Sequence, residues 1–525
     1  MLRGKYFSIF TIIFQKKERF KYRAIYRGYK KLKYENKLHL ITQLRDFLSE
    51  TRVNIGRVPA FLKADFDEEL SIRQYLTNRI LGKSFNKSIL YSIGTNKSLK
   101  HPLPKEWCQV LIEQEIQVNI LYCSVLWHWY VFLFWGHGVI QGLKSIFYLL
   151  QDKPKFGKSV YFYKINKSHL PINGKEHNIV NWYFQWKNRE KEVNIVMHSD
   201  KSVANYKFKN IEIIYTDGLP YIGGGKLFKY FFLQSYLYIY SLIFMFSKPY
   251  SAIMLGELIK LTRVRISEKN QLSADYMFHN SGSYYRPIWT YEAFKKKVRI
   301  FLYYYSTNGR NFKTKRGYPL QNPWHLINWP HYLVWDSYQA SILKQFNKCN
   351  STVEIVGDIW FSSSDMKIPE LSQNSVAVFD VQPMRSTYYV TMGLNTTFYE
   401  ASTAIQFLND VQDVLGIFHN KMIHKMKRTS IYTHKKYLHN LNELKKQSNY
   451  IEICPDLDAL KVIKKTRACI SFPFTSTAII AKYEGKPSVY YDPTGMIQKD
   501  DIAAHGIPVL IGKQELFEWV EDLHE

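Results

Sequence analysis

Short apolar runs alternate with helix-like segments from residue 375 onward, and this alternation constrains the fold more than any other feature of the chain. The runs are rich in Val, Ile, Phe and Tyr, which is typical of buried strands. The first helix-like segment, 397–416, ends at Gly416, a common helix stop. The predicted strands lie within 375–383, 421–428, 451–454, 468–473 and 487–493. Strands separated by helices pair in parallel, so this region predicts a doubly wound sheet.

A less regular version of the same alternation precedes residue 375. Its predicted strands lie within 159–163, 192–198, 210–220, 298–305, 332–335 and 352–361. Residues before about 150 have instead the long mixed apolar and basic stretches of helices. The predicted fold class is therefore α/β, with two Rossmann-like domains after a mostly helical, basic N-terminal region. We place these three parts at residues 1–150, 151–355 and 356–525.

The charge of the chain limits the classes of partner that we expect it to bind. With 72 Lys and Arg against 44 Asp and Glu, the formal net charge is +28. Residues 1–37 alone hold twelve Lys and Arg, which favours an anionic membrane surface, although a solvated lysine-rich helix explains the same pattern. The charge is spread along the chain without a recognisable nucleic-acid-binding module, so we expect no nucleic-acid partner.

Two uncharged stretches, 116–143 and 230–247, are long enough to cross a bilayer. The first contains Gln, Asn, His and Gly, and the second is rich in Tyr, which prefers membrane interfaces. The sequence leaves three alternatives open: spanning helices, buried core helices, or helices that lie on the membrane surface.

Cysteine and acidic residues indicate no metal. The five cysteines are scattered, without a Cys-x-x-Cys pair, which indicates a reducing compartment such as the cytoplasm. Asp456 and Asp458 have the spacing of a D-x-D motif but precede a predicted helix, so we interpret them as its cap. We expect neither a metal nor another cofactor.

A loop rich in hydroxyl groups follows the predicted strand at 468–473. It contains Thr475, Ser476 and Thr477, and Ser471 lies near the end of the strand. A helix that starts there offers free backbone N–H groups and a partial positive charge, which suit a phosphate or diphosphate. Ordinary helix capping by Ser and Thr is the alternative.

Cations end the predicted strand at 421–428. Lys425, Lys427 and Arg428 lie there beside His424, at the strand end that faces a ligand in a parallel sheet. They are candidates for binding the phosphates of a nucleotide, although a solvated basic turn is the simpler interpretation.

The segment SFPFTSTA, followed by GKPSVYYDP, resembles the signature of bacterial polysaccharide biosynthesis proteins named for a Pro-Phe-Thr-Ser motif, here Pro473 to Ser476. The resemblance extends over roughly 280–500, through PIWTYE, YLVWDSYQ and VFDVQP. It implies a B-type glycosyltransferase in which two Rossmann-like domains face each other across a cleft. The C-terminal domain would bind a nucleotide-sugar donor and the N-terminal domain a lipid-linked or oligosaccharide acceptor, without a metal.

The sequence departs from the B-type pattern where many such enzymes carry a glutamate that binds ribose. Ile480 or a neighbour occupies that place, and the nearest acid is Glu484. The Ser476-Thr477 pair is similar to a motif of bacterial sialyltransferases, which use a CMP-linked sugar. The donor therefore stays open among CMP-, UDP-, GDP- and dTDP-sugars.

Inverting transfer requires a base that accepts the proton of the acceptor hydroxyl. Asp217 is the first candidate, because it follows a predicted strand in a partial match to the acidic motif of sialyltransferases; a simple Asp-Gly turn is the alternative. His279 is the second, and His198 with Asp200 is the third.

The predicted function is a metal-independent glycosyltransferase that builds O-antigen or capsule, peripheral on the inner face of the cytoplasmic membrane. Two alternatives come from other classes: a glycerol- or ribitol-phosphate transferase of similar fold, and a basic nucleic-acid-binding protein. A protein that keeps the fold without activity is a third possibility.

Overall fold

A computed structural model describes most of the chain. The described residues are 20–31 apart from 22 and 29, then 66–149, 158–165, 167–171, 178–186, 193–280, 285–306, 313, 317, 327–346, 351–359, 366–384, 398–426 and 433–525. They divide between two compact units. The first comprises the described parts of 1–150 and 228–262, and the second those of 151–227, 263–385 and 397–525.

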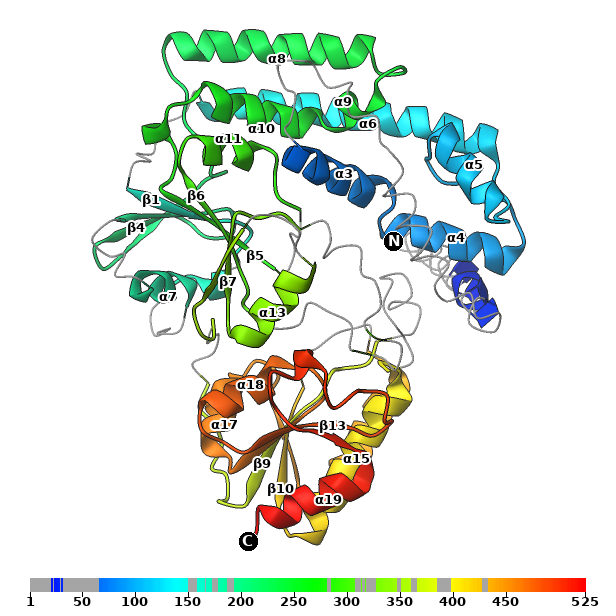
Figure 1. The fold of residues 1–525 in the computed structure, drawn as a ribbon, viewed down its shortest axis with the longest axis vertical. Helices are drawn as coiled ribbons and strands as arrows, with labels where there is room; N and C mark the ends of the chain where they lie inside the picture. Colours follow the sequence, from blue (N-terminus) through cyan, green and yellow to red (C-terminus); the bar gives the residue numbers. More distant parts are fainter. Residues whose placement is uncertain are drawn as a thin grey trace, which may run out of the picture. The chain divides into compact units, whose positions relative to one another are not determined.

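The first unit is helical. Its helices are α3 (Phe66–Ile80), α4 (Lys83–Thr95), α5 (Lys105–Glu113), α6 (Ile120–Leu149), most of α8 (Gly225–Ile243), α9 (Pro249–Ile253) and most of α10 (Leu255–Ile266). Helix α6 packs on α5 and α9, and Figure 1 shows α8 running alongside it. Among the described residues, no helix combines the length and the apolar character needed to cross a membrane.

An eight-stranded sheet forms the first α/β part of the second unit. Its order is β3-β4-β2-β1-β5-β6-β7-β8, and every pairing is parallel except that of the short edge strand β3 with β4. The strands are β1 (Ser159–Phe162), β2 (Ile195–His198), β3 (Tyr206–Phe208), β4 (Ile211–Tyr215), β5 (Asp275–His279), β6 (Arg299–Tyr303), β7 (His331–Val334) and β8 (Thr352–Ile355). The helices α7 (Ile179–Gln185), α11 (Trp289–Lys295) and α13 (Ser337–Phe346) connect them.

A six-stranded sheet, parallel throughout, forms the second α/β part. Its order is β11-β10-β9-β12-β13-β14, the 3-2-1-4-5-6 order of a Rossmann fold. The strands are β9 (Ser375–Phe379), β10 (Lys421–Lys425), β11 (Tyr450–Ile453), β12 (Ala468–Ser471), β13 (Ser488–Asp492) and β14 (Val509–Ile511). The helices are α15 (Ala401–Ile417), α16 (Lys435–Leu444), α17 (Ala459–Lys465), α18 (Ser476–Tyr483) and α19 (Gly512–Asp522).

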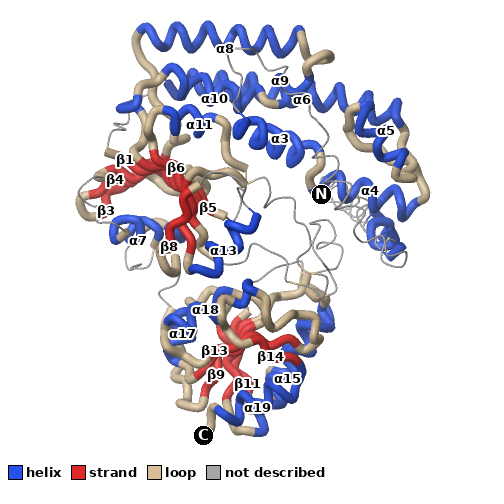
Figure 2. Tube along the Cα trace, in the orientation of Figure 1, coloured by secondary structure: helices blue, strands red, loops and turns tan. Residues whose placement is uncertain are grey.

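Helices cover both faces of this sheet, because its strands are apolar on both sides. Helix α15 packs against α16 and α19, whereas α17 packs against α18. Figure 2 shows α15 and α19 on one side of the strands and α17 and α18 on the other. All five residues of β9 are buried. In register, Phe379 of β9 lies level with Lys425 of β10 and Ser471 of β12, so the three strands end together.

The predicted fold class is confirmed. Both sheets are doubly wound and parallel around a central strand pair, and the described part of the N-terminal region is helical. The eight-stranded sheet repeats the Rossmann order around β1 and β5, with strands added at its edges.

Candidate functional site

The strand order of the six-stranded sheet creates a switch point between β9 and β12. The chain leaves β9 toward β10 and β11 on one side, and it leaves β12 toward β13 and β14 on the other. The backbone N–H of Phe472 donates to the carbonyl of Phe379 over 2.8 Å and extends this pairing past the strand ends. In open parallel sheets, ligands bind in the crevice outside the carboxyl ends of such strands.

The Pro-Phe-Thr-Ser segment occupies this switch point. Thr475 is the N-cap of α18, yet its side chain makes no capping hydrogen bond. Its hydroxyl lies 3.0 Å from the Thr477 hydroxyl, which lies 3.0 Å from the Ser471 hydroxyl. The Tyr490 hydroxyl donates to the Thr475 carbonyl over 2.8 Å and holds the loop in place. The hydroxyls of Ser471, Thr475 and Thr477 therefore form one connected row, and that of Thr475 is not used for ordinary helix capping.

This arrangement suits an anion. Ser471, Thr475 and Ser476 are buried, so the first turn of α18 lies in a protein environment of low dielectric constant. Helix N-termini carry a partial positive charge and N–H groups that point along the axis. A phosphate at this end would accept from backbone N–H and hydroxyl groups together.

Lys425 ends β10, and β10 is separated from the strand of this segment only by β9. The Lys425 ammonium donates to the Pro455 carbonyl over 2.9 Å, and the side chain is buried. Desolvation lowers the pKa of Lys425, while Asp458 and Asp456 act in the opposite direction. Asp458 caps α17 by accepting from the Leu460 N–H, as the sequence predicts. Lys427 and Arg428, the other predicted cations, lie outside the described residues.

A buried polar cluster, Asp380 with His424, Tyr437 and Tyr450, lies beneath the same strand ends. The Asp380 carboxylate lies 3.4 Å from Nε2 of His424 and accepts from the Tyr437 hydroxyl, and His424 Nδ1 lies 2.7 Å from the Tyr450 hydroxyl. Burial, and next the Asp380 charge, hold the pKa of Tyr437 well above its ordinary value. Both partners of the Asp380–His424 pair are fully buried. The sequence pattern indicates His424 but not Asp380.

The predicted base His279 lies at the matching place in the other sheet. It ends β5, which pairs with β1 at the switch point of the eight-stranded sheet. Its Nε2 lies 3.2 Å from the Lys164 carbonyl, so Nε2 carries the proton and Nδ1 is the basic nitrogen. Burial lowers the pKa of His279, which keeps the imidazole neutral near pH 7.

Asp217 has a different environment. One oxygen of its carboxylate pairs with the fully buried Arg263 over 2.8 Å, and the other accepts from the Leu219 N–H over 3.0 Å. Arg263 also donates to the carbonyls of Leu219 and Pro220. Asp217 thus anchors the turn after β4 and compensates a buried charge. Strands β4 and β5 are separated in the sheet by β2 and β1, so Asp217 and His279 follow strands that are not neighbours.

The third candidate pair lies at the end of β2. His198 is buried, its Nδ1 accepts from the Asp200 N–H over 3.2 Å, and burial lowers its pKa. The Asp200 carboxylate accepts from the N–H groups of Ser202 and Lys167 and from the Ser202 hydroxyl. Asp200 therefore organises local loops, and His198 presents no exposed nitrogen.

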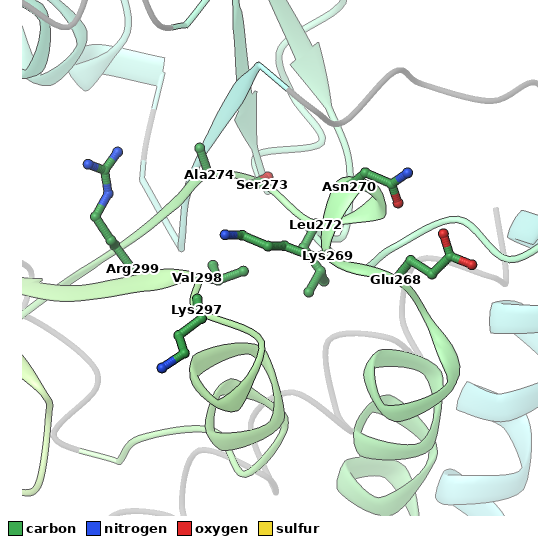
Figure 3. Close-up of a pocket in the computed structure, with 9 residues that line it drawn as sticks. All are labelled: Glu268, Lys269, Asn270, Leu272, Ser273, Ala274, Lys297, Val298 and Arg299. Carbon is green, nitrogen blue, oxygen red and sulfur yellow. The ribbon is translucent and has the colours of Figure 1, made fainter.

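A surface cavity of about 740 Å³ lies at the opposite edge of the eight-stranded sheet (Figure 3). Its lining includes Lys269, Lys297 and Arg299, next to the amino ends of β5 and β6. Arg299 is already paired with the buried Asp275. Because ligands of such sheets bind at the carboxyl ends, this cavity is not the candidate site.

Comparison with known proteins gives one family. The family model described as "Polysaccharide biosynthesis PFTS motif protein" matches residues 240–520. No curated protein matches the chain.

Solved structures give distant likenesses. MnaA of S. aureus, solved with UDP, aligns at 10% identity and a TM-score of 0.37 over 70% of this chain and 87% of its own. A putative UDP-N-acetylglucosamine 2-epimerase from Listeria monocytogenes aligns at 9% identity and a TM-score of 0.38, over 70% of this chain and 88% of its own. A UDP-glucosyltransferase from Polygonum tinctorium aligns at 8% identity and a TM-score of 0.34, over 71% of this chain and 91% of its own. Scores this low indicate nothing about the chemistry of this chain.

Proposed function

Because the chain belongs to the polysaccharide biosynthesis PFTS motif protein family, we propose that it is a nucleotide-sugar-dependent glycosyltransferase that extends a bacterial surface polysaccharide, O-antigen or capsule. The observation that carries the proposal is the position of the family's motif. Thr475 and Ser476 begin a helix at the switch point of a Rossmann sheet, where a diphosphate or phosphate is expected to bind.

The proposed donor site consists of the hydroxyl row and the first turn of α18. Ser471, Thr475, Ser476 and Thr477 would bind the phosphates of the donor, and Lys425, which ends β10 two strands away, would add positive charge at the same edge of the sheet. As sugar transfer proceeds, negative charge grows on the leaving phosphate, and preorganised N–H and O–H donors stabilise that charge without a metal. Lys427 and Arg428 stay predictions of donor contacts.

The eight-stranded sheet is the proposed acceptor side, with a lipid-linked or oligosaccharide acceptor. His279 has the chemistry that a base needs: a neutral imidazole with its basic Nδ1 fixed by the Nε2 contact to Lys164. Asp217 stays the alternative base, although its carboxylate already forms an ion pair with Arg263. We place the reaction at the cytoplasmic face of the membrane, where such acceptors would be presented.

The experiment that tests the donor site is a thermal-shift screen of CMP, UDP, GDP and dTDP with the full-length protein. A ligand at a hundred times its Kd adds about 2.7 kcal/mol to the free energy of unfolding, so the melting temperature should rise with one of the four. A melting temperature unchanged by all four nucleotides, at millimolar concentrations, would contradict the assignment. Mass analysis of the product separates sugar transfer from the transfer of a glycerol- or ribitol-phosphate, because only the latter retains phosphate.

The pH dependence of turnover tests the base. kcat/KM should decrease at low pH as the His279 imidazole is protonated. Because burial lowers the pKa of His279, we expect the midpoint of this decrease to lie below about pH 6.5, the ordinary pKa of histidine. His279→Ala should remove that decrease and lower kcat by about 10²–10⁴, the usual contribution of a general base. Asp217→Asn is the matched comparison, since it removes the charge of the other candidate. If neither variant loses more than about tenfold in turnover, both assignments are wrong.

A further inference from the structure

Helices α6 and α8 expose large apolar side chains along their lengths. Of 28 such exposed side chains in the described part of the chain, nine lie on α6 and eight lie between Phe228 and Phe246. Those on α6 are Leu121, Tyr122, Val125, Trp129, Phe132, Leu133, Ile140, Leu143 and Phe147, and the others are Phe228, Phe231, Phe232, Tyr236, Ile239, Leu242, Ile243 and Phe246. Apolar side chains gathered in this number mark a surface that binds a partner or a membrane.

The exposed side chains of α6 form a stripe. Most of them recur every three or four residues, which places them on one face of the helix. Cys123, Trp127 and Val131 form a different stripe that is buried, and Gly138 allows Leu255 of α10 to pack closely. Helix α6 therefore has two apolar faces, and the described residues of the protein cover only one of them.

Helix α8 reverses the pattern of a helix in water. Its buried residues include Gln234 and Ser241, whereas the exposed fractions of Phe228 and Phe232 are 72% and 68%. The Gln234 amide oxygen accepts from the Tyr238 hydroxyl over 3.0 Å, and the Ser241 hydroxyl donates to the Leu237 carbonyl over 2.6 Å. Polar groups inward and phenyl rings outward are the arrangement expected in contact with lipid chains.

The two helices contact each other and run antiparallel. Trp135 of α6 donates to the Tyr238 carbonyl over 3.3 Å, and the hydroxyls of Ser145 and Tyr230 lie 2.9 Å apart. The exposed His128 ring of α6 lies 5.3 Å from the exposed Phe246 ring. The apolar stripes of the two helices therefore adjoin.

The charged residues that belong to these two helices have one sign. Neither α6 nor α8 contains an acidic residue. Lys144 and Lys229 lie near the end where Ser145 meets Tyr230, and Lys248 follows the opposite end of α8. Lysines at the ends of an apolar surface complement the anionic headgroups of a bilayer, and exposed Trp129 and Tyr236 suit the interfacial layer.

We propose that the adjoining exposed stripes of α6 and α8 form a lipid-binding surface that inserts into the interfacial layer of an anionic bilayer, with both helices lying in the membrane plane. At 30 residues α6 is about 45 Å long, so a helix lying flat would immerse its stripe along its whole length. This inference is independent of the donor, since it rests on other residues and holds whichever group the enzyme transfers.

The test is co-sedimentation of the full-length protein with vesicles of phosphatidylcholine containing phosphatidylglycerol. Two double variants place glutamates in the stripes: Phe232→Glu with Ile239→Glu, and Trp129→Glu with Leu133→Glu. Each should lower the partition coefficient by about a hundredfold or more, because two apolar side chains no longer leave water. The matched control is Ile417→Glu with Leu438→Glu, which changes exposed apolar residues outside α6 and α8 and should bind like the wild type.

Fluorescence and oligomeric state distinguish insertion from electrostatic adsorption and from dimerisation. Brominated lipids should quench tryptophan fluorescence of the wild type, and Trp129→Phe should reduce that quenching. Circular dichroism shows whether the variants are folded. We expect them to fold, because substitutions at exposed positions usually change stability little. Unchanged sedimentation of both folded stripe variants overturns the proposal, as does binding that 1 M salt releases without any quenching. The proposal is also overturned if the wild type does not bind vesicles but forms dimers that the glutamate substitutions dissociate. That result would identify a second copy of the chain as the partner of this surface.

Discussion

Replacing Thr475 with aspartate is expected to remove the stabilisation by nucleotide and to lower kcat/KM by about a thousandfold. Thr475 is the N-cap of α18, and aspartate is among the best N-cap residues, so the helix should form in the variant. The new carboxylate would occupy the place of the phosphate. Two unit charges 4 Å apart repel by about 4 kcal/mol at an effective dielectric constant of 20, which corresponds to a factor of about a thousand in affinity.

The control for this variant is Thr475→Asn, which has the shape and capping ability of aspartate without its charge. We expect it to weaken nucleotide binding far less than the aspartate does. The nucleotide-dependent shift in melting temperature measures both variants without an activity assay. If Thr475→Asp and the wild type are stabilised equally by the same nucleotide, the N-terminus of α18 does not bind the donor.

The second large effect concerns stability. Asp380→Ala should lower the free energy of unfolding by about 1–3 kcal/mol, because it removes the acceptor of the Tyr437 hydroxyl and leaves that hydroxyl buried. Asp380→Asn retains an oxygen that accepts from Tyr437 and should cost less. Urea denaturation of the full-length protein, followed by fluorescence and circular dichroism, measures the difference.

Asp413→Ala is the matched control for the loss of a carboxylate. Asp413 pairs with Lys513 over 2.7 Å, but its side chain is 59% exposed, so its removal should cost at most about 1 kcal/mol. An Asp380→Ala variant as stable as Asp413→Ala would show that the buried cluster does not stabilise the fold.

The sequence predicts the frame of the six-stranded sheet well. Strands β9 to β13 all coincide with predicted runs, because buried parallel strands are continuously apolar and their connections are short. Strands β3, β5 and β14 are not among the predicted runs. Three residues after a proline give β14 little periodicity, and the ends of β5, Asp275 and His279, are polar. Tertiary contacts explain β5, since Arg299 and Tyr183 satisfy Asp275 inside the protein.

In the candidate site too, the sequence reveals features that are local in sequence but not contacts between residues that are far apart in sequence. The hydroxyl loop and its helix are local in sequence, so their types and spacing reveal them. Asp380 acquires its role from His424, 44 positions later, and Asp217 from Arg263, 46 positions later. Single-sequence patterns do not contain such pairings. The sequence also does not show which face of α6 is covered, because its apolar residues lie on two faces and give no single period.

The placement of α8 and α10 has a consequence for any attempt to purify this protein in a simplified form. Both helices belong to the connection between β4 and β5, and Arg263 at the end of that connection is tied to the turn after β4 where it begins. The exposed phenyl rings are thus encoded inside the α/β frame rather than in a detachable tail. Trimming the first 150 residues would leave α8 in place and uncover its contact with α6. We therefore expect shortened versions to need detergent or lipid nanodiscs at least as much as the intact chain.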